Sequence, residues 1–282
     1  MIRIDAWKQN LEILEADLGK ALAAANRQRE DLRVIVVTKT HQAAILDELM
    51  ELQVRDIGES YAQEAIGKKQ WLRDANRDLS AVDWHMIGHV QTRKARAVAT
   101  HFDWVHSLDS LKLARRLDTA ARDLEKRQEV LIQVNISGEA SKHGFPAQTE
   151  GDRERLLEVV ETLLHLENLD VRGLMSIPPL DENKQIARDH YAKTRELKDW
   201  LHEKISAAQL SELSMGMSND FTEAILEGST MIRVGKAVLG PRETKSRSMY
   251  GCIGVYAVSR VVLVGYCPRD PLLFHVPIPS GA

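Results

Sequence analysis

The sequence contains few cysteines, few aromatic residues and almost no excess charge of either sign. Its two cysteines among 282 residues can build neither a disulfide framework nor a four-ligand zinc site. The 38 basic and 41 acidic side chains give a formal net charge of −3, which offers no electrostatic reason to bind nucleic acid or an anionic membrane. No basic segment followed by an apolar one opens the chain, so we expect no secretory signal. These absences predict a soluble, cytoplasmic α/β protein.

Residues 246–282 lack lysine and glutamate, and their composition differs from that of the rest of the chain. They hold both cysteines and four of the eight prolines. Their apolar run at 251–267 is too short for a membrane-spanning helix, and an arginine interrupts it. The change in composition predicts a boundary near residue 245, between a main domain at 1–245 and an irregular C-terminal extension at 246–282. The sequence assigns no role to this extension.

The main domain alternates short apolar strands with amphipathic helices. A long helix is predicted first, because apolar residues from Ile4 to Leu22 recur at steps of three and four residues. The predicted strands are 33–38, 55–58, 83–87, 103–107, 129–135, 170–175, 211–215 and 230–234. The predicted helices between them are 42–54, 60–77, 91–101, 109–127, 152–167, 182–207 and 219–228. Eight strands joined by helical crossovers predict a single (β/α)8 TIM barrel, a fold that typically needs about 250 residues.

An open, doubly wound sheet is the alternative arrangement of alternating strands and helices. Such a sheet normally uses fewer strands over this length. The sequence also has neither the glycine-rich loop that binds dinucleotides nor a Walker-type phosphate loop. We therefore favour the barrel.

Lys39 directly follows the β-branched strand predicted at 33–38. In TIM barrels the chemistry takes place at the carboxyl ends of the strands, so this lysine would reach the mouth of the barrel. Partial burial there would favour its neutral amine, which can attack a carbonyl carbon. The alternative is a lysine that ends a strand and extends to water.

The loops after the last two predicted strands contain glycine and hydroxyl residues in positions that suit phosphate. Gly216 and Gly235 allow a close approach of the backbone, and Ser218 supplies a hydroxyl before a helix. In barrels these two loops often bind phosphate, although a glycine–serine turn can also be a simple helix cap. A phosphate site facing a lysine amine suggests pyridoxal 5′-phosphate held as a Schiff base.

Several segments, in order along the chain, resemble the pyridoxal phosphate homeostasis proteins of the YggS/PROSC type. The matching segments are 37–40, 84–94, 133–144, 173–177, 214–220 and 228–235. The resemblance runs from about residue 5 to Arg242. It implies the barrel of the alanine racemase N-terminal domain and pyridoxal phosphate as the cofactor.

The resemblance also implies a role for individual residues. Lys39 would form the internal aldimine, and Arg233 would face the pyridine nitrogen. Ser218 and the backbones of Gly216 and Gly235 would contact the phosphate. Ser60 stands where the family usually has asparagine, so a shorter hydroxyl replaces an amide near the cofactor. The complete predicted cofactor-binding set is Lys39, Ser60, Ser214, Gly216, Met217, Ser218, Arg233 and Gly235.

No metal site is predicted, because no set of histidine, cysteine and carboxylate residues stands at ligand spacing. Strand alternation predicts that His85 points opposite to Trp84, and His89 is expected on the rim of the barrel. Both histidines could therefore lie near the cofactor pocket. Tyr61 and Tyr191 fall on predicted helices and are expected to be packing residues.

Arg233, placed as the resemblance implies, argues against most cofactor-dependent catalysis. A guanidinium can only donate hydrogen bonds, so it would keep the pyridine nitrogen unprotonated and make the ring a poor electron sink. Racemisation needs a second base opposite Lys39, which alanine racemases take from a second domain that this chain is too short to contain.

We therefore predict a monomeric, non-enzymatic protein of intracellular pyridoxal phosphate homeostasis, which holds the cofactor on Lys39 without turnover. Its partners would be the cofactor itself and the apoenzymes that receive it. A weak amino-acid racemase on the same site is the alternative. A scaffold or regulatory protein, in which the cofactor reports metabolic state, is a third hypothesis.

Overall fold

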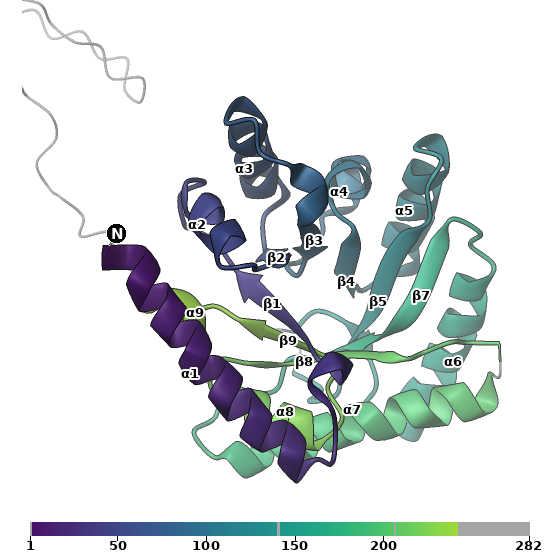
Figure 1. The fold of residues 1–282 in the computed structure, drawn as a ribbon. Helices are drawn as coiled ribbons and strands as arrows, with labels where there is room; N and C mark the ends of the chain where they lie inside the picture. The colour runs from purple at the N-terminus through teal and green to yellow at the C-terminus, as the bar shows by residue number, and fades with distance from the viewer. Residues whose placement is uncertain (1, 140–141, 206, 242–282) are drawn as a thin grey trace, which may run out of the picture. The chain divides into compact units, whose positions relative to one another are not determined.

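A computed structural model describes residues 2–139, 142–205 and 207–241, with the side chains described from Ile4 onwards. The extension predicted at 246–282 lies outside the described residues. Eight parallel strands form a closed barrel surrounded by helices, which confirms the predicted TIM barrel with an N-terminal helix (Figure 1). The barrel strands are β1 (Arg33–Val37), β2 (Asp56–Glu59), β3 (Asp83–Met86), β4 (Trp104–Leu108), β5 (Gln128–Asn135), β7 (Leu169–Met175), β8 (Glu212–Met217) and β9 (Met231–Val234).

The barrel closes where β9 pairs with β1, with Ile35 opposite Arg233. A two-residue strand, β6 (Phe145–Pro146), adds to the end of β5. Every predicted strand is present, with boundaries within two residues of the prediction. The strands were predictable because buried parallel strands are β-branched and apolar, whereas β6 is too short to show a pattern.

Helices follow the strands, as each right-handed crossover requires. They are α1 (Ile2–Ala24), α2 (Ile45–Glu51), α3 (Ala62–Asp74), α4 (Ala95–His101), α5 (Leu111–Asp123), α6 (Glu150–Leu164), α7 (Lys184–Lys204), α8 (Phe221–Leu226) and α9 (Lys236–Leu239). Side-chain caps define several starts: Ser110 accepts from Leu113 N–H before α5, and Thr149 forms a capping box with Asp152 before α6. The short helix α9 was not predicted, because four residues carry no periodic signal.

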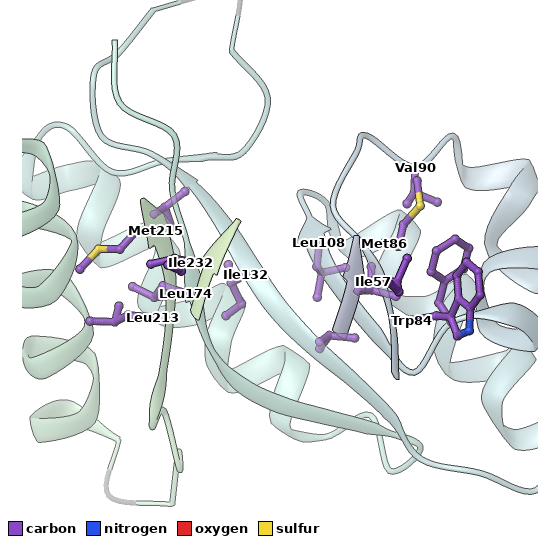
Figure 2. Packing of buried hydrophobic residues seen from close by; sticks show 14 of the residues in the cluster. Ile57, Trp84, Met86, Val90, Leu108, Ile132, Leu174, Leu213, Met215 and Ile232 are labelled. Carbon is purple, nitrogen blue, oxygen red and sulfur yellow. The ribbon is translucent and has the colours of Figure 1, made fainter. Parts of the chain in front are cut away.

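The core consists of two layers of side chains. The outer layer lies between the strands and the helices, and Figure 2 shows Trp84 and Leu213 among its members. The inner layer fills the barrel with Ile35, Trp104, Leu131, Met175 and Met231. Side chains alternate along a strand, so His85 and Trp84 point to opposite sides, as predicted. His85 points into the barrel and Trp84 packs outside it.

The two tyrosines differ from one another. Tyr191 is fully buried on α7, which confirms its predicted packing role. The same prediction is wrong for Tyr61, whose side chain is 61% exposed. Tyr61 occupies the position before the first residue of α3, where the extended backbone points its ring away from the packed face of the helix.

The N-terminal helix packs against the end of the barrel sequence. Asn10 of α1 donates a hydrogen bond to the backbone oxygen of Val238 in α9 at 2.8 Å. Contacts with α8 and α9 place α1 beside the helices that precede and follow β9 (Figure 1). Among the described residues, no helix combines the length and the apolar composition that a bilayer crossing needs.

Candidate functional site

A pocket opens at the carboxyl ends of the strands, where the barrel rule predicts a site. Six of the eight predicted binding residues line it: Lys39, Ser60, Met217, Ser218, Arg233 and Gly235. The structure therefore brings together residues from the ends of β1, β2, β8 and β9. Ser214 and Gly216 do not belong to this lining.

Lys39 is partly buried and follows β1, with a strained residue beside it. Thr40 has φ of 69°, a left-handed conformation that is uncommon for a β-branched residue. Its backbone N–H donates to the carboxylate of Glu64 on α3 at 2.5 Å, which holds the turn in place. Such strain is found where a fold keeps a functional residue in a defined orientation.

A buried ion pair lies directly behind Lys39. The ammonium of Lys68 on α3 is 2.5 Å from Glu59 Oε1 and donates to the backbone oxygen of Thr38 at 2.7 Å. The Thr38 hydroxyl also donates to Glu59 Oε1 at 2.5 Å. Burial raises the pKa of the Glu59 carboxyl, and the charge of Lys68 acts in the opposite direction. The network fixes the end of β1 from behind, and sequence reasoning did not identify it.

Arg233 points into the barrel from β9 and is almost completely buried. Its two terminal nitrogens donate to Ser214 Oγ at 2.5 Å and to the backbone oxygen of Ser176 at 3.0 Å. Burial lowers the pKa of the guanidinium, but an arginine stays cationic in proteins. The pocket therefore contains a fixed positive charge that can only donate hydrogen bonds.

Ser214 and Gly216 lie behind the pocket lining. The hydroxyl of Ser214 is fully buried between Arg233 and His106, so this serine contacts the arginine. Gly216 has φ of 96°, and a Cβ there would lie 2.6 Å from the Cβ of Ala224 on α8. Glycine is needed at this position because α8 packs closely against β8.

Ser218 joins the two loops that were predicted to bind phosphate. Its hydroxyl oxygen accepts from the backbone N–H groups of Gly235 at 3.2 Å and Ala237 at 3.3 Å. Met217 N–H donates to the Asp220 carboxylate at 2.6 Å, which orders the loop before α8. The hydroxyl and the two amides therefore lie together at the first turn of α9, beside the pocket.

Seven further residues line the pocket and were not predicted. They are Val37, His41, Ile87, Ile177, Asn219, Lys236 and Gly240. Several of them lie inside the sequence segments that match the family. The apolar ones carry no group that could bind a ligand by hydrogen bonds, so the sequence gave no reason to predict them as binding residues. His41 and Asn219 carry polar groups whose direction depends on the loops after β1 and β8.

A separate cluster lies on the rim of the barrel, and spacing along the sequence did not reveal it. His89 Nδ1 lies 2.8 Å from Asp109 Oδ2, and His143 Nδ1 lies 4.0 Å from the same oxygen. The three possible ligand atoms are within 4.8 Å of one another. The imidazole rings are stacked at 4.0 Å with 13° between their planes, so their nitrogen lone pairs do not converge on one point.

The chain matches the family model described as alanine racemase, N-terminal domain, over residues 2–243. It is 37% identical over 236 residues to the pyridoxal phosphate homeostasis protein of Vibrio alginolyticus, which covers 84% of this chain and 97% of that protein. The corresponding protein of Pseudomonas aeruginosa is 38% identical over 235 residues, a match that covers 83% of this chain and 95% of that protein. This chain belongs to the pyridoxal phosphate homeostasis protein family.

Solved structures agree with this family assignment. PipY of Synechococcus elongatus, in a structure with pyridoxal phosphate (PLP) bound, is 33% identical with a TM-score of 0.71 and covers 83% of this chain and 100% of that one. An alanine racemase of Clostridium difficile is 16% identical with a TM-score of 0.60, covering 83% of this chain and 58% of that one. The latter likeness supports the fold alone.

Proposed function

We propose that this protein binds pyridoxal 5′-phosphate and serves in its homeostasis, with Lys39 holding the cofactor covalently. The observation that carries the proposal is the presence of Lys39, Arg233 and the Ser218 loop in one pocket. The names of the relatives and the cofactor in the PipY structure support the same role.

The donor set of the pocket suits the three functional groups of this cofactor. When bound, the cofactor supplies an aldehyde that condenses with a primary amine and releases water. Lys39 provides that amine, and Arg233 provides a donor for the pyridine nitrogen. Ser218, with the amide of Gly235 beside it, provides hydrogen-bonding groups for the phosphate. Ser60 and Met217 complete the proposed contacts.

The two residues behind the lining take indirect roles in this proposal. Ser214 acts on the cofactor through Arg233, to which it is hydrogen-bonded. Gly216 permits the close packing of β8 against α8, which sets the position of Ser218. A direct contact of either residue with the cofactor stays a prediction.

A carrier role is favoured over catalysis. Arg233 would hold the ring nitrogen of the cofactor as a hydrogen-bond donor and would leave it unprotonated, so the ring would be a poor electron sink. The relatives are named as homeostasis proteins and not as enzymes. No tyrosine of the described chain lines the pocket as a second base for racemisation.

The rest of the proposal concerns the whole chain. The family match ends at residue 243, which supports a PLP-binding domain at 1–245 followed by a separate extension at 246–282. A monomeric state, a cytoplasmic location and delivery to apoenzymes stay predictions from the sequence.

The deciding experiment is a titration of the purified protein with pyridoxal phosphate, followed by absorbance. The wild type should develop a visible Schiff-base band, and Lys39→Ala should not. Lys94→Ala should behave as wild type, because Lys94 donates to Gln63 and does not line the pocket. Borohydride reduction and peptide mass spectrometry should then place the label on Lys39. A colourless wild type, or a label on another lysine, would contradict the proposal.

The racemase alternative is tested on the same loaded protein. Incubation with single enantiomers of the common amino acids should give no antipode above the level of Lys39→Ala. Formation of an antipode that depends on Lys39 would establish the alternative.

A further inference from the structure

A chain of buried polar side chains crosses the barrel interior from Arg233 to its opposite end. Arg233 donates to Ser214 Oγ at 2.5 Å, and Ser214 Oγ lies 2.8 Å from His106 Nδ1. His106 Nε2 lies 2.9 Å from His85 Nδ1, and His85 Nε2 lies 3.0 Å from the carboxylate of Asp56. Asp56 is the first residue of β2, so the chain reaches the amino end of the strands.

The two end groups fix the outer hydrogen bonds, and the inner ones follow from them when both imidazoles are neutral. Arginine can only donate and an ionised carboxylate can only accept. Ser214 therefore accepts from Arg233 and donates its proton to His106 Nδ1. His106 then carries its proton on Nε2 and donates to His85, which in turn carries its proton on Nε2 and donates to Asp56. Each intermediate group donates once and accepts once, with both imidazoles neutral.

Burial supports the neutral state of His106, at the centre of the chain. His106 and the Ser214 hydroxyl beside it are completely buried, so an imidazolium at His106 would lose its hydration. The pKa of His106 is well below the ordinary histidine value, because burial and the neighbouring His85 and Arg233 disfavour a further positive charge. Arg33 faces the Asp56 end, with 3.5 Å between their charged groups.

The reversed chain is the competing arrangement. In it, His85 would be an imidazolium paired with Asp56, and His106 would donate from Nδ1 to Ser214. Ser214 Oγ would then accept two hydrogen bonds, and its own proton would need another acceptor, which the hydrogen bonds of the described residues do not supply. The neutral chain satisfies all of these groups.

We propose that Asp56 is a positioning residue for Arg233, acting through His85, His106 and Ser214. A hydroxyl that donates to His106 is a stronger acceptor for the guanidinium, because hydrogen bonds in a chain polarise one another. The carboxylate at the far end thereby holds Arg233 in the orientation that meets a ligand. That the ligand is a pyridine nitrogen rests on the proposed function. The hydrogen-bonded relay from Asp56 to Arg233 does not depend on it.

The relay is tested first in the cofactor-free protein by ¹⁵N NMR of the imidazole side chains. At neutral pH, His85 and His106 should both be neutral and protonated on Nε2, with assignments made from His85→Gln and His106→Gln. An imidazolium at His85, or an Nδ1-protonated His106, would overturn the relay. This result does not depend on cofactor binding.

Positioning is tested with the guanidinium resonances of Arg233 in the same cofactor-free protein. Asp56→Ala should shift them, and Asp56→Asn should return them toward wild type, because its amide oxygen can still accept from His85. Gln128→Ala is the control, since Gln128 is a buried polar residue at the amino end of β5 but donates to the backbone oxygen of Asp103. Identical Arg233 resonances in Asp56→Ala and wild type would overturn the proposal.

The last readout uses the protein loaded with ¹⁵N-labelled pyridoxal phosphate. Asp56→Ala should move the ring-nitrogen resonance and weaken affinity about tenfold, the equivalent of one hydrogen bond. Asp56→Asn should restore both, and Gln128→Ala should change neither. If Asp56→Ala does not fold, His106→Gln takes its place. If Asp56→Ala shifts the Arg233 resonances of the cofactor-free protein but the wild type binds no pyridoxal phosphate, the proposed function is refuted and the relay stands.

Discussion

Ser218 Oγ lies 3.2 Å from the backbone nitrogen of Gly235, so one hydroxyl connects the loop after β8 to the loop after β9. The amide of Ala237 donates to the same oxygen at 3.3 Å. This arrangement places a side chain and two backbone donors at one corner of the pocket. A phosphate at that corner could accept hydrogen bonds from the Ser218 hydroxyl and from the two backbone amides.

Ser218→Ala should therefore weaken binding of pyridoxal phosphate about tenfold, since one hydrogen bond to a charged group contributes roughly 1.5 kcal/mol or more. Pyridoxal without the phosphate should bind the variant and the wild type equally. Parallel absorbance titrations with the two ligands measure this difference. Ser137→Ala, whose serine lies after β5 outside the pocket lining, is the control. An equal loss of affinity for both ligands would show that Ser218 does not contact the phosphate.

The buried pair of Lys68 and Glu59 predicts a large effect on stability. Lys68→Met should lower the free energy of unfolding by about 3–5 kcal/mol, because it leaves a buried carboxylate without its counter-charge. The double variant Lys68→Met/Glu59→Leu should recover much of this loss. Urea unfolding of the two variants and the wild type measures the coupling. A double variant less stable than Lys68→Met would contradict this interpretation of the pair.

The same pair predicts how stability depends on pH. Burial raises the pKa of Glu59 in the folded state, so this residue contributes stability that is present at low pH and is lost as pH rises through the folded pKa. Without Lys68 that pKa rises further. The deficit of Lys68→Met relative to wild type should therefore be smaller at pH 5 than at pH 8. A deficit that does not change with pH would show that Glu59 is not the group responsible.

The sequence was sufficient for the parts of the fold that depend on local patterns. The β-branched run before Lys39 predicted β1, and the two-residue alternation of the strand predicted that His85 points opposite to Trp84. Glycine and serine residues predicted the loops after β8 and β9. These features need only a few neighbouring residues to be recognised.

Contacts between strands could not be predicted in the same way. Asp56 meets His85 only because β2 and β3 pair with Gly58 opposite His85, a register that no local pattern specifies. Ser214 was predicted as a ligand contact, and its position behind Arg233 depends on the register of β8 and β9. Lys68 is buried on α3, although a lysine in a helix usually indicates a solvated face.

His190 predicts a loss of stability in acid. It is buried on α7, and burial, together with the charge of Lys142, lowers its pKa to about 4. The unfolded chain therefore binds the proton more tightly, and stability falls as pH drops from about 6.5 to 4, by up to about 3 kcal/mol. Unfolding free energies at several pH values between 7 and 4 measure this fall.

His190→Gln should lose less stability than the wild type over that pH range, because glutamine does not titrate. His165→Gln is the matched control, since His165 is exposed and its Nδ1 donates to the backbone oxygen of Glu161 at 2.7 Å. Equal pH dependence in His190→Gln and wild type would assign the acid sensitivity to another group, such as the buried His106.

The strained turn at Thr40 predicts that stability and binding change in opposite directions. Thr40 has φ of 69° directly after Lys39, and glycine adopts this conformation without the steric cost of a β-branched side chain. Thr40→Gly should therefore stabilise the cofactor-free protein by about 1 kcal/mol. The freed turn should hold Lys39 less firmly, so affinity for pyridoxal phosphate should decrease.

Gln53→Gly separates these two effects. Gln53 has a similar φ of 62° but follows α2, outside the residues that line the cofactor pocket. It should gain similar stability with unchanged affinity, when unfolding and absorbance titrations are compared for both variants. If Thr40→Gly binds the cofactor as tightly as wild type, then the strain at Thr40 is incidental to binding. Lys39 would in that case be oriented by the buried network of Thr38, Glu59 and Lys68 alone, and Lys68→Met should weaken binding while Thr40→Gly does not.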